Sequence, residues 1–90
     1  MAPGEKVYVP AEVDAGAFPS EKFVTVQSQE GPVSGFARDD FIMRQGANQY
    51  LLAEVTGVSA ERLTVKLFGS FFTTTGLAQL SRSLDVLKAG

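Results

Sequence analysis

The side chains that could do chemistry here are carboxylates, amines and hydroxyls, because the 90 residues include neither histidine nor cysteine. Without histidine there is no Ser-His-Asp triad, no imidazole base and no histidine-ligated zinc. Without cysteine there are no disulfides, thiolate nucleophiles or thiolate metal sites. Most common hydrolase and transferase mechanisms are therefore excluded for this chain.

Asp39 and Asp40 form the only adjacent carboxylate pair in the sequence. Two carboxylates can hold a divalent cation, but a calcium loop spreads alternating acids over about 12 residues, and that pattern is absent. A short helical turn is expected over residues 39–42, where an Asp oxygen could cap the exposed amides. The sequence therefore favours capping over metal binding, and we expect neither a metal nor a cofactor.

Short blocks of sequence recur at an offset of about 40 residues, the length of one supersecondary unit. The matching blocks are Ala11-Glu12-Val13 with Ala53-Glu54-Val55, Val24-Thr25-Val26 with Leu63-Thr64-Val65, and Ser34-Gly35-Phe36-Ala37 with Thr75-Gly76-Leu77-Ala78. A chance match is the alternative for blocks this short. If the repeat is real, it predicts one compact pseudo-twofold domain over residues 1–90, with repeat A at about 5–43 and repeat B at about 49–88.

The repeat also places carboxylates in equivalent positions, Glu12 with Glu54 and Glu21 with Glu61. A twofold axis could bring one of these pairs together and create the paired carboxylates of acid–base catalysis. The alternative, which the sequence favours, is that these are solvated carboxylates at strand ends. We therefore expect no catalytic residue.

Alternation of polar and apolar residues predicts short strands and no long helix. We expect six strands, at residues 6–9, 22–27, 33–37, 50–56, 63–67 and 72–77. Pro10 should end the first strand or keep it at an edge. Leu80, Leu84 and Leu87 recur at helical spacing and suggest a short C-terminal helix. The expected core comprises Val7, Val9, Val24, Val26, Phe36, Leu63, Val65 and Leu67.

Six short strands predict an all-β fold that closes into a small barrel, because closure removes exposed strand edges. At this size an SH3-like barrel is the leading candidate. The alternative is a pseudo-twofold six-stranded barrel in which the two copies exchange strands. Gly35 and Gly76 fall inside strand patterns, where a tightly coiled sheet would need a bulge or kink.

The first half of the chain resembles small bacterial SH3-like β-barrel proteins of unassigned function. The segments that carry this resemblance are Val7-Tyr8-Val9-Pro10-Ala11-Glu12-Val13, Phe18-Pro19-Ser20-Glu21-Lys22 and Val33-Ser34-Gly35-Phe36-Ala37. The resemblance covers most of the first copy of the repeat and little of the second. It implies the fold alone and brings no activity with it.

Four aromatic residues form the candidate interaction surface. Tyr8, Phe23 and Phe68 fall on the polar phase of their strands, and Phe18 stands in the first long loop. Outward aromatic rings on a small barrel can bind peptides or nucleic acids. Packing against the rest of the protein is their commonest role, and a seam between two copies is the next. The outward phase of Tyr8, Phe23 and Phe68 motivates the hypothesis of an isologous dimer, in which one patch meets itself across a twofold axis.

The charge balance does not favour nucleic acid, since eight basic and ten acidic residues leave a net charge of −2. Binding to phosphates would need Arg38, Arg44, Arg62, Lys66 and Arg82 to gather on one face. No apolar run reaches about 18 residues, and the start lacks the features of a signal peptide, so a cytoplasmic protein without a membrane span is expected. The sequence predicts a non-enzymatic module that binds a protein partner or itself. A nucleic-acid-binding barrel and a carboxylate-based catalytic barrel are the alternatives.

Overall fold

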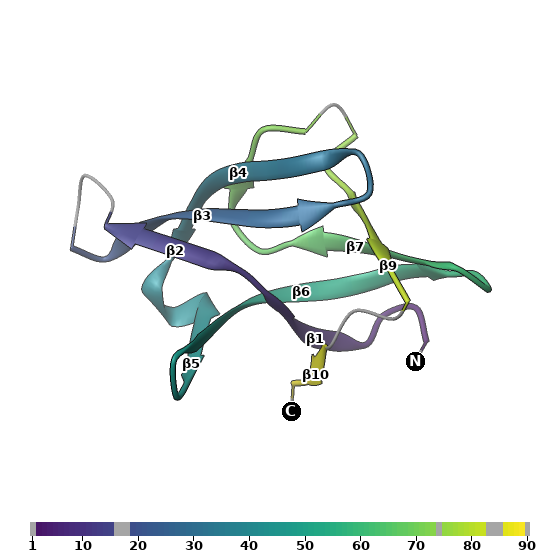
Figure 1. Ribbon diagram of the computed structural model, residues 1–90, viewed down its shortest axis with the longest axis horizontal. Helices are drawn as coiled ribbons and strands as arrows, with labels where there is room; N and C mark the ends of the chain where they lie inside the picture. The colour runs from purple at the N-terminus through teal and green to yellow at the C-terminus, as the bar shows by residue number, and fades with distance from the viewer. Residues whose placement is uncertain (1, 16–18, 74, 83–85, 90) are drawn as a thin grey trace.

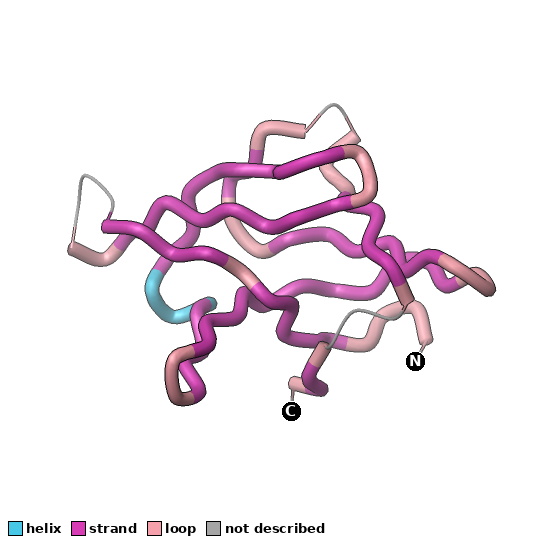
Figure 2. Tube along the Cα trace, in the orientation of Figure 1, coloured by secondary structure: helices cyan, strands magenta, loops and turns pink. Residues whose placement is uncertain are grey.

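Two antiparallel sheets make up the protein in a computed structural model, which describes residues 2–15, 19–73, 75–82 and 86–89. Figure 1 shows the smaller sheet above the larger one, and Figure 2 shows that strands dominate the described chain. No helix among the described residues is long and apolar enough to cross a membrane.

The large sheet has the strand order β10-β1-β6-β7-β9, with β5 also pairing with β6. Its organising strand is β6, which pairs with β1 on one side and with β5 and then β7 on the other. The strands are β1 (Lys6–Pro10), β5 (Ile42–Gln45), β6 (Asn48–Val58), β7 (Arg62–Leu67), β9 (Ala78–Ser81) and β10 (Leu87–Lys88).

The small sheet has the order β2-β3-β4-β8. Its centre is a hairpin of β3 and β4, whose turn is stabilised by the Ser28 hydroxyl, which donates to the Gly31 carbonyl at 2.6 Å. The strands are β2 (Glu12–Ala15), β3 (Glu21–Ser28), β4 (Gly31–Arg38) and β8 (Ser70–Phe71).

Among the described strands the chain crosses between the sheets four times, once along the longer connection from β8 back to β9 and three times at short corners. One corner lies at Ala11 between β1 and β2, one at the 3₁₀ turn η1 (Asp39–Phe41) between β4 and β5, and one at Gly69 between β7 and β8. Gly69 has φ +135°, and a Cβ there would lie 2.5 Å from the Phe36 carbonyl oxygen, so only glycine fits this corner. The corners place the two sheets face to face, with the apolar core between them.

The described core contains the residues that strand alternation predicts, with one exception, and it also includes Tyr50, Leu51, Ala53, Val55, Ala78 and Leu80, which were not predicted. Every residue of the expected core is buried apart from Phe36, the largest of them, which is half-buried on the outer face of the small sheet. Ala37 takes the inward position in β4 instead. The phase prediction for this strand was therefore wrong, because close contact between β4 and β8 leaves room only for small side chains on the inner side.

The close contact between β4 and β8 also explains why residue 35 is glycine. The predicted bulge is not present, because β3 and β4 pair without a register shift across Gly35. A Cβ at Gly35 would instead collide with the Ser70 carbonyl oxygen and lie 2.5 Å from Phe71 Cα. Glycine is needed at position 35 because β8 lies so close to β4 there. Gly76 lies in a bend outside the strands.

The all-β prediction is confirmed, but the described residues form ten strands rather than six, and their two sheets do not form one closed ladder. The nearest approach to closure is the Gln29 amide, which donates to the Gln79 carbonyl at 2.8 Å between the β3–β4 turn and β9. Pro10 ends β1, as expected. The extra strands arise largely because the chain bends at corners, and a short segment on either side of a corner carries little alternation.

The end of the chain differs most from expectation. Leu80 lies in β9 and Leu87 in β10, so the predicted C-terminal helix is wrong, while Leu84 falls outside the described residues. The strand predicted at 72–77 is also absent from the residues described there. Leu80 is buried opposite Leu63 of β7, and this cross-strand burial outweighs the weak helical spacing.

The two proposed copies each supply a three-stranded antiparallel run, β2-β3-β4 and β6-β7-β9. Their registers differ, however. Val13 pairs with Val24 in the first run, whereas its counterpart Val55 pairs with Val65 rather than with Leu63, and a bulge follows Val55. A twofold relation between the copies stays a prediction.

Candidate interaction surfaces

The outer face of the large sheet carries a line of apolar side chains that crosses several strands. Tyr8 of β1 pairs with Leu52 of β6 on one side and with Leu87 of β10 on the other. The Phe68 amide, just past β7, donates to the Leu52 carbonyl at 3.1 Å. Tyr8 and Leu52 each stand between two residues buried in the core, so alternation turns their side chains outward. Leu87 shares the face of its cross-strand partner Tyr8, and Phe68 follows the buried Leu67. We call Leu87, Tyr8, Leu52 and Phe68 the apolar row.

One end of the apolar row is extended by the turn η1. The Phe41 ring packs edge-to-face on Phe68, with 5.3 Å between centroids. A cavity of about 330 Å³ opens beside the two rings and is lined also by Glu54 and Lys66. Lys6 pairs with Glu54, and Glu54 with Lys66, so charges of alternating sign border the apolar row.

The outer face of the small sheet carries a different feature, which we call the aromatic cluster: Phe23, Phe36 and Phe72. Phe23 and Phe36 are cross-strand partners with centroids 5.4 Å apart, and Phe36 meets Phe72 at 6.4 Å, both edge-to-face. The Phe72 amide donates to the Ser34 carbonyl at 3.0 Å, which anchors its backbone. Phe72 is nevertheless 72% exposed, the most exposed large apolar residue among those described.

The structure thus divides the predicted interaction residues between two faces. Tyr8 and Phe68 belong to the apolar row, Phe23 belongs to the aromatic cluster, and Phe18 lies outside the described residues. Sequence reasoning missed Leu52 and Phe72, and it also missed Leu87, which it assigned to a helix. Leu52 stands in an unbroken run of apolar residues, so alternation does not predict which way its side chain points. Phe72 follows a corner, where alternation likewise predicts no orientation.

A groove opens where β2 leaves β1 and turns toward the small sheet. The Ala11 amide donates to the Gln49 carbonyl at 2.9 Å, and beyond this bond β2 diverges from β6 to pair with β3. The space between has a volume of about 580 Å³. Its walls are residues 10–14 on one side and 47–50 on the other, with the buried Tyr50 among them. We call this space the edge groove.

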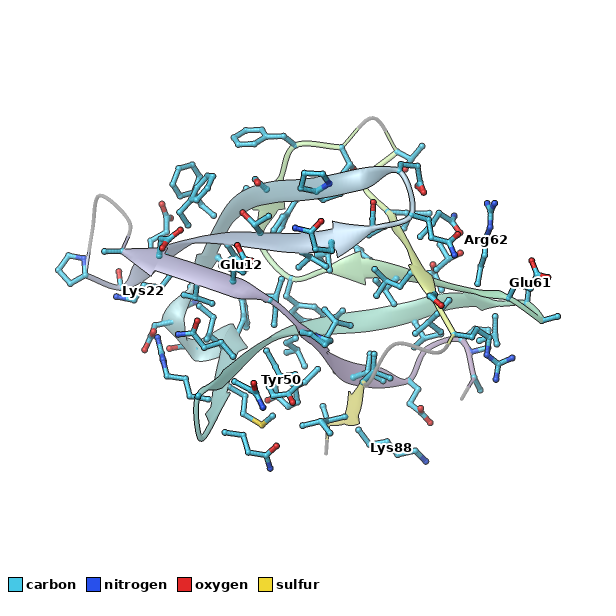
Figure 3. The ribbon with its side chains drawn as sticks, in the orientation of Figure 1. Glu12, Lys22, Tyr50, Glu61, Arg62 and Lys88 are labelled. Atoms are coloured by element: carbon cyan, nitrogen blue, oxygen red, sulfur yellow. The ribbon has the colours of Figure 1, made fainter. Side chains whose placement is uncertain are left out.

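The carboxylates predicted as pairs do not meet. Glu12 stands in β2 of the small sheet and Glu54 on the outer face of the large sheet. Glu21 begins β3 opposite Arg38, whereas Glu61 lies in the β6–β7 turn. Figure 3 shows Glu61 and Lys22, the neighbour of Glu21 in β3, toward opposite ends of the long axis. The structure therefore brings together neither pair proposed for acid–base chemistry.

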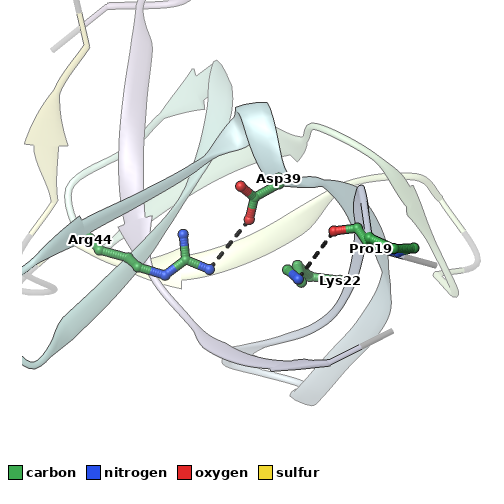
Figure 4. A network of polar contacts seen from close by, with 4 residues as sticks. All are labelled: Pro19, Lys22, Asp39 and Arg44. Carbon is green, nitrogen blue, oxygen red and sulfur yellow. Dashed lines mark hydrogen bonds and ion pairs between the residues drawn. The ribbon is translucent and has the colours of Figure 1, made fainter. Parts of the chain in front are cut away.

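The adjacent Asp39 and Asp40 bind arginines rather than a helix end. Asp40 accepts from Arg38 at 2.7 Å, and Asp39 accepts from Arg44 at 3.3 Å, the contact drawn in Figure 4. Neither carboxylate caps η1, so the capping prediction was wrong. The carboxylates bind arginines and not the backbone amides of η1, because the corner places Arg38 of β4 and Arg44 of β5 on either side of the turn. Among the described residues, no three acidic side chains gather as a metal site.

The five basic residues that nucleic acid would require are dispersed. Arg38 and Arg44 flank η1 and are engaged with its carboxylates. Arg62 and Arg82 lie at the β6–β7 turn, where Arg82 donates to the Ser59 carbonyl at 2.9 Å. Figure 1 shows η1 and this turn toward opposite ends of the long axis.

Comparison of the chain with protein-family models, with curated proteins and with solved structures gave no match.

Proposed function

We propose that this protein is a non-enzymatic interaction module that associates with a second copy of itself through the apolar row. One observation carries the proposal: β10, β1, β6 and the end of β7 each place an apolar side chain at the same level of one outer face. The open face of an antiparallel sheet is commonly polar, because it faces water. An apolar line across it is typical of a surface that another protein covers.

A second copy is favoured as the partner by the charges that border the apolar row. Lys6 and Lys66 flank Glu54. A copy rotated by 180° about an axis that passes between Glu54 and Lys66 sets the lysine of each copy against the glutamate of the other. A standard interface needs about 800 Å² from each partner, roughly a seventh of the 5337 Å² of accessible surface here. The net charge of −2 adds little repulsion between copies.

We further propose that the fold is an open relative of the small SH3-like barrels. Two compact antiparallel sheets between whose described strands the chain crosses four times support this relation. The contact between Gln29 and Gln79 lies where a continuous ladder would close the barrel. An experimental structure would test the relation by the pairing of β3 with β9.

Sedimentation equilibrium at micromolar concentration tests the self-association. The unaltered chain should be a dimer. Leu52→Arg places a charge at the centre of the apolar row, and burying it unpaired should raise the dissociation constant roughly a hundredfold or more. Gln27→Arg is the matched control, because it adds the same charge at an exposed strand position of the small sheet and should leave the dimer intact.

Two results would contradict this proposal. One is a monomer at every concentration. The other is a dimer that survives Leu52→Arg but is lost in Phe23→Ser, which would assign the interface to the aromatic cluster of the small sheet.

A further inference from the structure

A second binding site follows from the free edge of β2. This strand pairs with β3 on one side, and no other described strand pairs with it. In an antiparallel ladder, alternate residues direct their N–H and C=O groups away from the partner strand. An edge strand therefore presents unpaired backbone groups to any chain that can lie beside it. Residues 12–15 offer such an edge, about 13 Å long at the usual rise per residue.

The edge groove provides the space for an added strand. It runs beside β2, and the β5–β6 hairpin forms its other wall. The bond between Ala11 and Gln49 closes its apex, so a segment entering the groove would continue the pairing where β6 and β2 separate. A second cavity, of about 230 Å³, adjoins β2 at Glu12 and is lined by Thr25 and Gln27 of β3.

The charges on β2 specify what kind of strand fits. Glu12 and Asp14 stand two residues apart, so they share the outer face of the small sheet, opposite Thr25 and Phe23. Neither carboxylate forms an ion pair with a described residue. The nearby arginines at η1 are engaged with other acids.

We propose that β2 captures an extended segment of another protein that carries lysine or arginine at two positions two residues apart. Backbone pairing with β2 would supply the affinity, and the two basic side chains would face Glu12 and Asp14. A second copy of this chain is a poor occupant, because antiparallel pairing of two β2 strands sets carboxylates against carboxylates. The site is separate from the apolar row, so it does not depend on the proposed dimer.

The competing explanation is that the two carboxylates merely protect a sheet edge from unwanted pairing. Fluorescence anisotropy with labelled peptides separates the two. The probe Thr-Lys-Val-Lys-Val-Thr should bind the full chain, and Thr-Glu-Val-Glu-Val-Thr should bind roughly tenfold more weakly at low salt. The double variant Glu12→Lys with Asp14→Lys should reverse this preference.

Backbone methylation tests the added strand itself. Methylating one set of alternate amides of the lysine peptide should abolish binding, and methylating the other set should leave it, because only one set faces β2. Leu52→Arg should bind the peptide as the unaltered chain does, so loss of the dimer and loss of this site are distinguishable. Absence of binding, equal binding of both peptides, or insensitivity to the methylation pattern would each overturn the proposal.

Discussion

Both sheets carry apolar side chains on their outer faces, but these side chains are covered to different extents on the two sheets. On the large sheet, outward apolar side chains lie side by side across neighbouring strands and half-bury one another in the apolar row. On the small sheet, the aromatic cluster stacks edge-to-face toward a strand end and leaves Phe72 exposed. The difference follows from the number of flanking strands. A residue in the middle of a broad sheet has neighbours on both sides, whereas one at the margin of a narrow sheet does not.

The contrast also separates two kinds of recognition. The apolar row is broad and bordered by charges of both signs, which suits a large self-complementary interface. The small sheet offers an acidic free edge beside a groove, which suits a single extended segment. Changes confined to one sheet can therefore test the two surfaces independently.

The largest effect is expected from Gly35→Ala, which should disrupt the small sheet alone. The new Cβ would meet backbone atoms of β8, at Ser70 and Phe71, and backbone cannot yield as a side-chain tip can. We expect a loss of about 3 kcal/mol in the free energy of unfolding, measured by urea denaturation. Gly57→Ala is the control, since its nearest contact, Thr64 Cβ, would lie 3.6 Å away. Equal stabilities of the two variants would show that β8 is not held closely against β4.

A smaller loss is expected from Val65→Ala, which distinguishes the two faces of the large sheet. Val65 is fully buried in the core, and the next residue, Lys66, is exposed on the outer face. Removing two methyl groups should cost about 2 kcal/mol, as a large-to-small core change does. Lys66→Ala should change stability by less than about 0.5 kcal/mol. The reverse order would mean that the phase of β7 is wrong by one residue.

The smallest effects should come from the aromatic cluster. Phe36→Ala removes the ring that contacts both other rings and should cost roughly 1–2 kcal/mol from lost edge-to-face pairs and burial. Phe72→Ala should cost less than about 0.5 kcal/mol, because most of that ring is already in water. Thermal unfolding would compare them. A Phe72→Ala loss as large as that of Phe36→Ala would indicate that the ring is covered in solution.

Much of the interior could be predicted from local sequence. Strand alternation correctly identified Val7, Val9, Val24 and Val26 as core, because a period of two assigns one face of each strand to the interior. The same reasoning failed for Phe36, where β8 approaches too closely to admit a large inward side chain. A phenylalanine in a strand pattern usually predicts burial. Here contacts with β8, a segment distant in the sequence, determined the sheet face on which Phe36 lies.

The candidate surfaces were predictable only in part, for a related reason. The outward phase of Tyr8, Phe23 and Phe68 follows from alternation, yet nothing in the sequence says that Tyr8 shares a sheet face with Phe68 and not with Phe23. That division depends on which strands become neighbours. The edge groove was not predictable at all, because it arises where β2 separates from β6 at a corner.

The sequence by itself determined the all-β character, about half of the described core and the lack of histidine or cysteine chemistry. These depend on residue type and on a periodicity that acts within a few residues. Only the tertiary structure decided the arrangement of the described residues as ten strands in two sheets, the conversion of the expected C-terminal helix into β9 and β10, and the grouping of the outward residues. Those outcomes depend on pairing between segments far apart in the chain, where burial against a neighbouring strand outweighs weak local preference.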